Sequence, residues 1–238
     1  MTTPTYAARL DAQDWPALTG ALDARGHAVT APLLTSAECR EIAAWYEDDS
    51  RFRSRVVMER HTYGEGEYRY FSYPLPDAVA ALRAALYARL APLASDWAAR
   101  LGGQEPFPPD LASYTARCHA AGQTKPTPLL LRYETGGYNR LHQDLYGDLV
   151  FPLQVTLLLS APEKDFDGGE FVLVEQRPRA QSRVEVVPLA QGAMVIFAVR
   201  HRPATGARGT YRVALRHGVS RIRRGRRFAL GLILHDAG

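Results

Sequence analysis

The chain has 238 residues, of which 46% are hydrophobic and 23% charged, and its formal net charge is +4. This length suits one domain, or one catalytic core with an N-terminal extension, and the apolar fraction is ordinary for a soluble globule. The mild excess of basic residues permits an anionic partner without requiring one. No run of about eighteen consecutive apolar residues occurs, which argues against a membrane-spanning helix.

The cysteines and the N-terminal residues indicate the cellular compartment in which the protein is expected. The two cysteines, Cys39 and Cys118, are far apart and form no Cys-x-x-Cys motif, which argues against a disulfide framework or a zinc site. The first twenty residues carry Asp11 and Asp14 and lack a long apolar block, which argues against a secretory signal. We therefore expect a cytoplasmic protein.

The N-terminal stretch predicts two helices and a short strand. A first helix over 15–24 should end at Gly26, and a short strand should follow over 29–34. The motif Thr35-x-x-Glu38 is a capping box and predicts a second helix, which begins there and runs through residue 46.

Arginine and aromatic residues alternate between residues 51 and 73, where Gly64-Glu65-Gly66 predicts the turn of a hairpin. Aromatic rings for stacking and arginines for phosphate are typical of a nucleic-acid surface. The alternative is a half-buried hairpin with one aromatic face on the core and one solvated face of arginines. Helices are predicted over 76–101, where Pro92 should break or kink the helix, and over 111–121, after a proline-rich loop at 104–110.

From residue 128 onward the pattern changes to short strands. Eight are predicted: Leu129–Tyr133, Leu141–Leu145, Phe151–Leu159, Phe171–Glu175, Val184–Val187, Ala193–Ala198, Arg212–Val219 and Phe228–Leu234. Eight strands after a helical half predict a mainly β fold with N-terminal helices, built on a double-stranded β-helix of the jelly-roll type. We expect residues 1–126 to be a helical support region with the basic hairpin, and residues 127–238 to be the catalytic core, within one compact unit.

The pair His142-x-Asp144 is the first candidate for chemistry. Side chains two residues apart on a strand point to the same face, so an imidazole and a carboxylate should aim at one point. With a second histidine they would form the 2-His-1-carboxylate triad, which leaves three positions on iron open. The pair alone is weak evidence because it also occurs by chance.

A downstream segment supplies the partner. His217-Gly218-Val219 is followed by Gly225-Arg226-Arg227, with Arg227 ten residues after His217. This His-x-Val and Gly-x-Arg spacing resembles the C-terminal half of Fe(II)/2-oxoglutarate dioxygenases. The Asp167–Phe171 run resembles their Gly-Gly-Glu segment, and Tyr133-x-x-Gly-Gly-Tyr138 resembles the prolyl-hydroxylase layout.

The likeness extends to one bacterial family, catalogued as an oxygenase that oxidatively demethylates damaged DNA. It is carried by Leu141–Gly147, by the run from Gly168, by Arg216–Ser220 and by the ending Leu234-His235-Asp236-Ala237. It is strong over residues 125–237 and loose before them.

The resemblance implies the cofactors and the roles of the site residues. His142, Asp144 and His217 would bind Fe(II), with 2-oxoglutarate and O2 as co-substrates. Arg227 would hold the far carboxylate of 2-oxoglutarate through a bidentate contact, and Tyr133 would be a second contact to it.

Other histidines compete for the third iron position. His201 follows Ile196-Phe197, but Tyr211 stands ten residues later where a cation is needed, so the pattern favours His217. Residues 200–209 then become an inserted loop near the site, carrying three arginines at positions 200, 202 and 208. For His235 a core or surface role is favoured over a role in the site.

Three functions remain open from the sequence. The first is a DNA-repair demethylase, acting on DNA or RNA that is single-stranded or presents a flipped base. The second is a protein hydroxylase of the prolyl type, or a small-molecule hydroxylase, using the same iron. The third is a jelly-roll binding protein without activity, which a complete triad with a correctly spaced arginine disfavours.

Overall fold

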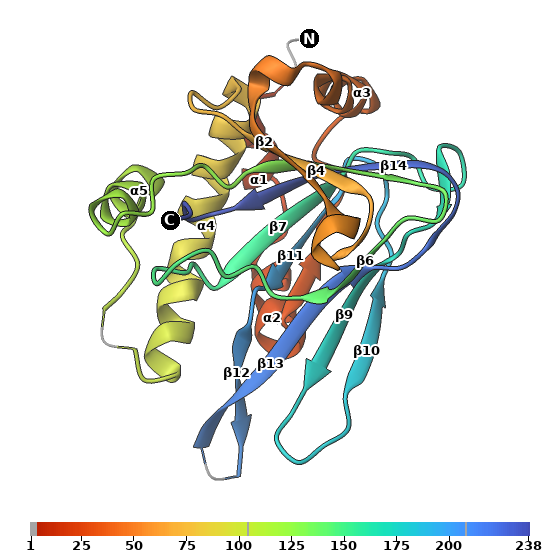
Figure 1. The fold of residues 1–238 in the computed structure, drawn as a ribbon. Coiled ribbons are helices and arrows are strands. Elements are labelled where there is room, and N and C mark those ends of the chain that lie inside the picture. Colours follow the sequence, from red (N-terminus) through yellow and green to blue (C-terminus); the bar gives the residue numbers. More distant parts are fainter. Residues whose placement is uncertain (1–3, 104, 208) are drawn as a thin grey trace.

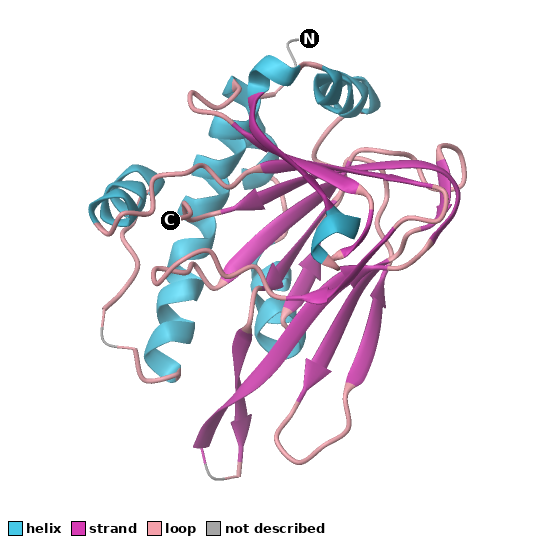
Figure 2. Ribbon diagram, viewed as in Figure 1, coloured by secondary structure: helices cyan, strands magenta, loops and turns pink. Residues whose placement is uncertain are grey.

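The computed structural model describes residues 4–103, 105–207 and 209–238. Gln104 and Arg208, from two of the predicted loops, lie outside these ranges. Two antiparallel sheets enclose the core, and helices flank the larger one (Figures 1 and 2). Among the described residues, none of the helices combines the length and the hydropathy that a bilayer crossing requires.

The larger sheet has the order β1-β11-β7-β14-β5-β4-β2, and β8 also pairs with β14. Its strands are β1 (His27–Val29), β2 (Phe52–Val57), β4 (Glu67–Phe71), β5 (Leu129–Glu134), β7 (Leu153–Leu158), β8 (Phe166–Gly168), β11 (Met194–Ala198) and β14 (Ile222–Ile233). The two central strands β7 and β11 are buried along their whole length. β11 is a continuous apolar run and β7 is apolar apart from Gln154 and Thr156, because both faces of the sheet are covered.

The smaller sheet has the order β10-β9-β13-β6-β3, and β12 also pairs with β13. Its strands are β3 (Gly64–Glu65), β6 (Tyr138–His142), β9 (Phe171–Gln176), β10 (Arg183–Val187), β12 (His201–Gly206) and β13 (Gly209–Val219). The inner side chains of both sheets join one apolar cluster, in which Leu157 and Leu230 of the larger sheet meet Leu173 and Leu215 of the smaller one.

Helices cover the outside of the larger sheet. They are α1 (Tyr6–Asp11), α2 (Trp15–Arg25), α3 (Ser36–Ala44), α4 (Asp77–Arg100) and α5 (Leu111–Ala120), with 3-10 turns at Trp45–Glu47, Asp49–Arg51 and Met58–His61. The predicted capping box is present at the start of α3, where the Thr35 side chain and Glu38 bond each other's backbone. The predicted break at Pro92 is wrong, because α4 runs through that residue.

Several sequence predictions need correction. The short strand near the N-terminus is His27–Val29, where it pairs with β11, and not 29–34. Helix α1 and strand β8 were not predicted. The segment from residue 200 is no inserted loop: β12 pairs with β13 from His201↔Ala214 to Gly206↔Gly209. The other predicted strands are present with shifted ends, and the one predicted at residues 141–145 lies earlier, at Tyr138–His142.

Strands that precede residue 126 also belong to the sheets. β2 and β4 extend the larger sheet beyond β5, and β3 pairs with β6 of the smaller sheet. The segment between β2 and β4 therefore crosses from one sheet to the other. The division of the chain at residue 126 stays a prediction.

Candidate active site

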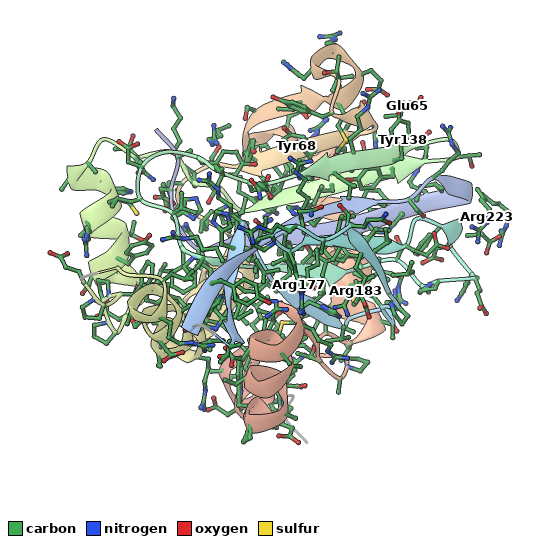
Figure 3. The ribbon with its side chains drawn as sticks, turned by 90° about the horizontal axis from the view of Figure 1, so that it is seen from below. Glu65, Tyr68, Tyr138, Arg177, Arg183 and Arg223 are labelled. Carbon is green, nitrogen blue, oxygen red and sulfur yellow. The ribbon has the colours of Figure 1, made fainter. Side chains whose placement is uncertain are left out.

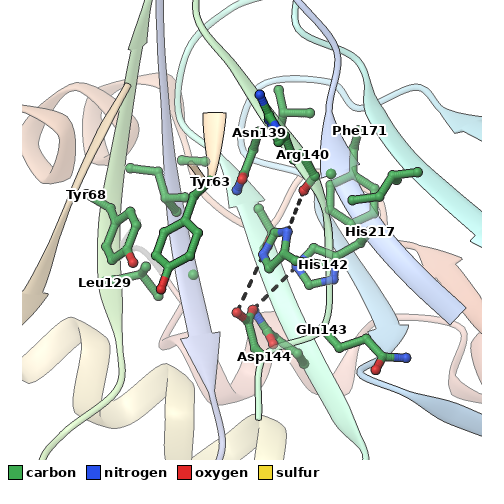
Figure 4. Close-up of a pocket in the computed structure, with 18 of the residues that line it drawn as sticks. Tyr63, Tyr68, Leu129, Asn139, Arg140, His142, Gln143, Asp144, Phe171 and His217 are labelled. Carbon is green, nitrogen blue, oxygen red and sulfur yellow. Dashed lines mark hydrogen bonds and ion pairs between the residues drawn. The ribbon is translucent and has the colours of Figure 1, made fainter. Parts of the chain in front are cut away.

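Three side chains with metal-binding atoms meet where β6 and β13 lie side by side (Figure 4). His217 is paired directly with His142, the last residue of β6, and Asp144 follows two residues later. One ligand atom from each residue lies within 4.8 Å of the other two. Nε2 of His142 is 3.5 Å from Oδ1 of Asp144, and Nε2 of His217 is 3.4 Å from Oδ2. The three residues face one point, as the sequence predicted.

The predicted reason for that convergence was only half right. The expected strand over residues 141–145 ends at His142, so Asp144 lies in the following loop and not on the strand. β13 changes its partner at Leu215, whose carbonyl accepts the side-chain amide of Gln143 at 2.8 Å and whose N–H donates to the carbonyl of Arg200 at 2.8 Å. The contact between Gln143 and Leu215 holds the loop against β13 and so places Asp144 beside the two histidines.

Protonation of the three residues suits a metal ion. Nδ1 of His142 lies 2.7 Å from the carbonyl oxygen of Arg140 and must donate to it, which leaves the lone pair on Nε2. Burial, and then the neighbouring His142, lower the pKa of His217, so this ring is neutral at pH 7. Burial acts to raise the pKa of Asp144, but the close contact with His217, the proximity of His142 and the donor Gln154 outweigh it and hold that pKa well below its usual range.

The carboxylate of Asp144 is oriented by two further donors. The Tyr146 hydroxyl donates to Oδ1 at 2.8 Å, and the Gln154 amide donates to Oδ2 at 2.8 Å. The Tyr70 hydroxyl donates in turn to Tyr146 at 2.9 Å. Sequence reasoning missed these residues. The available signal was Gln154, an amide inside the apolar strand Leu153–Leu158, where a buried polar group needs a partner.

Arg227 and Tyr133 form a second polar group in the same cavity. They are register partners on β14 and β5, and both are buried. Nε of Arg227 and the hydroxyl of Tyr133 are buried without hydrogen-bond partners, and within the described residues no carboxylate lies within 4.0 Å of the guanidinium. Burial raises the pKa of Tyr133 to about 12, against the opposing charge of Arg227, so the hydroxyl remains a donor at neutral pH.

Gly169 makes room for Arg227. Its φ of 62° lies in the left-handed region, which favours glycine. A Cβ at this position would collide with the Ile222 side chain and would lie 3.0 Å from Cδ of Arg227. The Gly-Gly-Glu segment therefore permits the close approach of backbone and guanidinium.

The triad and the arginine open into one cavity of about 430 Å³, which all five predicted site residues line. Its mouth carries exposed apolar and aromatic side chains: Tyr63, Leu141 and Leu145. Tyr63 and Tyr68 lie side by side across from His142 (Figure 4). The size is typical of a small-molecule or base-sized pocket.

The remaining histidines lie outside the triad. His201 begins β12 and lines a different hollow. His235 is buried, accepts the backbone N–H of Phe151 at 3.2 Å through Nδ1, and has its pKa lowered to about 4 by burial. His61 stacks on Tyr63 at a centroid distance of 5.3 Å, and His119 contacts Asp236 at 2.8 Å.

The contacts of the basic hairpin match the fold-supporting alternative. Arg51, Arg55 and Arg69 form ion pairs with Asp48, Glu67 and Asp49. Arg53 donates to the carbonyl of Pro126 at 2.9 Å and lies over the Tyr70 ring. Its aromatic residues divide between the core and the cavity, where Tyr63 and Tyr68 form one wall.

Solved structures with similar folds are oxygenases. A Pseudomonas putida prolyl-4-hydroxylase aligns with a TM-score of 0.52 at 18% identity, over 91% of this chain and 96% of that one. A Trichoplax adhaerens prolyl hydroxylase aligns at 0.54 with 15% identity, over 97% and 92%. A 2OG-Fe(II) oxygenase family protein from Burkholderia pseudomallei aligns at 0.51 with 17% identity, over 94% and 93%. These likenesses confirm the predicted double-stranded β-helix.

Sequence comparison places the chain in a family. Two uncharacterised Mycobacterium tuberculosis proteins, from strains CDC 1551 and H37Rv, are each 53% identical over 167 residues, which cover 70% of this chain and 72% of theirs. A family model described as "Oxygenase, catalysing oxidative methylation of damaged DNA" matches residues 66–237. With this match, the jelly-roll fold and the His-Asp-His cluster, the chain belongs to that oxygenase family and is a dioxygenase that uses Fe(II), 2-oxoglutarate and O2.

Proposed function

We propose that this protein oxidatively demethylates alkylated bases in nucleic acid. The main support for this chemistry is that one cavity contains both the triad and the buried guanidinium of Arg227. This guanidinium has no acidic partner among the described residues. A buried cation is costly unless a ligand pairs with it. The far carboxylate of a dicarboxylate co-substrate would supply such a partner within the same cavity.

Each residue has a defined task in this proposal. His142, Asp144 and His217 hold Fe(II), with Asp144 kept ionised and oriented by its two donors. Arg227 would bind the far carboxylate of 2-oxoglutarate through two N–H groups of its planar guanidinium, and the Tyr133 hydroxyl would donate to the same carboxylate. The apolar wall around Phe171 and Val219 limits water near the reacting centre.

When bound, Fe(II), 2-oxoglutarate and O2 together hydroxylate a C–H bond and release succinate and CO2. An N-methyl group treated in this way becomes a hydroxymethyl group, which leaves as formaldehyde and restores the N–H. This chemistry removes methyl groups and does not add them. We therefore take the family's oxidative reaction on damaged DNA as demethylation.

The nucleic-acid substrate is supported by the family description and by the mouth of the cavity. Tyr63 is half exposed there, as a stacking surface for a base. Arg140, also at the mouth, is exposed and forms no ion pair among the described residues. A base stacked inside a duplex cannot reach metal ligands that are buried like Asp144 and His217, so a flipped or single-stranded nucleotide is required.

A second candidate is a hydroxylase of protein or small-molecule substrates. It is favoured by the likeness to prolyl-hydroxylase structures and by the Tyr133-x-x-Gly-Gly-Tyr138 motif. Fold similarity at this level of identity does not define a substrate, because one fold carries many activities.

A substrate screen separates the two candidates. Iron-loaded protein is incubated with N-methylated oligonucleotides, with proline-containing peptides and with small metabolites, and formaldehyde and succinate are measured together. We expect equal amounts of both products with methylated oligonucleotides, and none from Asp144→Ala. Succinate formation that responds to peptides or metabolites, without formaldehyde from any oligonucleotide, would show the proposal to be wrong.

The ligand assignment is tested by metal binding. His217→Ala should abolish tight binding of Fe(II) under anaerobic conditions, measured by calorimetry, because it removes one of three ligands. His201→Ala is the matched control and should bind iron like the unaltered protein. The reverse result would exchange the roles of the two histidines.

A further inference from the structure

A second hollow, of about 350 Å³, lies on the outer face of the smaller sheet next to the iron cavity. Its lining contains no acidic residue and consists of Gln143, Val174, Gln176, Ser182, Arg200, His201, Ala214 and Arg216. We call it the basic hollow. Gln143 also lines the iron cavity, and in Figure 4 its side chain points away from His142 and Asp144. The two spaces therefore share Gln143 in their linings.

The backbone explains why the cations gather there. At Leu215, β13 leaves β12 and begins to run beside β6, and its N–H and C=O bond to Arg200 and Gln143. Arg216 follows directly. Successive strand residues face opposite sides, so His217 points into the barrel and Arg216 points outward. The register Arg216↔Val174 places Val174 of β9 beside Arg216 on the same face.

The arginines of the basic hollow have no acidic partners. Among the described residues, neither Arg200 nor Arg216 forms an ion pair or a side-chain hydrogen bond. Nearby arginines differ: Arg177 and Arg183, which lie beside each other in the view of Figure 3, share Glu175 at 2.8 and 3.8 Å. Arg202 takes the other oxygen of Glu175 at 2.7 Å. Glu175 is thus engaged by three arginines that do not line the basic hollow.

We propose that the basic hollow binds a phosphate group of a polynucleotide whose target base occupies the iron cavity. The inference rests on the proposed function and extends it to a defined contact with the backbone. The two guanidinium groups offer donors alone, and the imidazole of His201 can add one N–H donor, which suits the oxygens of a phosphodiester. The shared Gln143 wall allows one nucleotide strand to reach both spaces.

The first test is oligonucleotide binding across a salt series, followed by fluorescence anisotropy with anaerobic iron-loaded protein. Arg216→Ala and Arg200→Ala should each weaken binding of a methylated single strand about tenfold. Each should also lower the slope of log affinity against log salt by about 0.7. The control Arg40→Ala removes one positive charge from helix α3, far in the sequence from the residues that line the iron cavity or the basic hollow. It should leave the affinity and the salt slope unchanged.

A chemical change in the strand locates the contact. An uncharged methylphosphonate replaces one phosphodiester at a time on either side of the methylated base. For the unaltered protein, one linkage near the base should be the sensitive one. Arg216→Ala should show no further loss at that linkage, because the two changes remove the same contact. Independent, additive losses would contradict the proposal.

Binding of inorganic phosphate tests the basic hollow independently of the proposed demethylase function. Titrated into the isotope-labelled protein, it should shift the backbone amide signals of Ser182, His201 and Arg216 by NMR, and these shifts should be lost in Arg200→Ala. If the protein binds oligonucleotides but both arginine variants bind them equally well, the basic hollow is no phosphate site, although the demethylase proposal stands. If no oligonucleotide binds, the demethylase proposal fails. If phosphate also causes no shifts of the amide signals, the basic hollow is not a phosphate site either.

Discussion

Two arginines that are neighbours in the sequence occupy opposite environments. Arg227 is 2% exposed, faces Tyr133 and has no acidic partner among the described residues, whereas the Arg226 side chain is 55% exposed and pairs with Glu134 at 3.1 Å. Strand alternation accounts for the contrast. An isolated buried cation is typical of a site for an anionic ligand.

Arg227→Met should therefore weaken 2-oxoglutarate binding by roughly 2–5 kcal/mol, because the far carboxylate loses its charged partner inside the protein. Arg227→Lys should recover part of the affinity, since a lysine keeps the charge but not the bidentate fork. Anaerobic calorimetry of 2-oxoglutarate binding to the iron-loaded protein measures both. Arg226→Ala is the control, and a loss there equal to that of Arg227→Met would mean that neither arginine is the specific contact.

At the level of elements, the start of α3 shows how one side chain can serve several contacts. Glu38 closes the capping box through the N–H of Thr35 at 2.8 Å and also forms a bidentate pair with Arg9 of α1 at 2.7 Å. The capping box was readable from the sequence because its spacing is local. The link to Arg9 was not, since α1 itself was not predicted.

Glu38 should make the stability of the protein depend on acidic pH. The hydrogen bond from Arg9 is the largest cause that lowers the pKa of Glu38, to about 2, against burial, which raises it. A depressed carboxyl pKa contributes stability above its unfolded value, here 4.5, and this contribution disappears as the pH falls through the folded value. The stability difference between the unaltered protein and Glu38→Gln should thus be full above pH 5 and shrink from about pH 4.5 towards pH 2.

Urea unfolding at a series of pH values measures that difference. Glu41→Gln, on the exposed face of the same helix, is the control and should show no such dependence. A difference between Glu38→Gln and the unaltered protein that stays constant from pH 6 to pH 2.5 would contradict the assignment.

Across the whole molecule, a buried ion pair ties the C-terminus to the helices. Arg83 of α4 bonds Asp236 at 2.7 Å and the carbonyl of Ile233 at 2.9 Å, and both side chains are almost fully buried. Tyr73 and His119 also contact the Asp236 carboxylate, each at 2.8 Å. The network joins α4, α5 and the end of β14, which carries Arg227 on the same strand.

Removing Arg83 should be costly, since it leaves a buried carboxylate without its strongest partner. We expect Arg83→Met to lower the free energy of unfolding by roughly 3–5 kcal/mol. Arg89→Met, on the same helix, breaks an exposed pair with Asp11 and should cost about 1 kcal/mol or less. Urea denaturation compares the two, and similar losses in both variants would exclude a special role for the buried pair. Arg83→Lys, which retains a charge, should fall between them.

Sequence alone was enough for features that depend on short spacing. His142-x-Asp144, the interval from His217 to Arg227 and the Thr35-x-x-Glu38 box were all visible as patterns, and so were most strands, because burial imposes a local period on the chain. The resemblance of these motifs to one oxygenase family then supplied the cofactors.

Tertiary structure decided what depends on residues that are distant in the chain. It ended β6 at His142, because β13 exchanges its partner at Leu215, and so placed Asp144 in a loop. It made a strand of residues 201–206 and paired Arg55 and Arg69 of the hairpin with acids, while Arg200 and Arg216 form no ion pair among the described residues. Local sequence patterns do not show which charged side chains will form ion pairs or where a strand will exchange its partner. Both depend on how segments that are distant in the chain pack together.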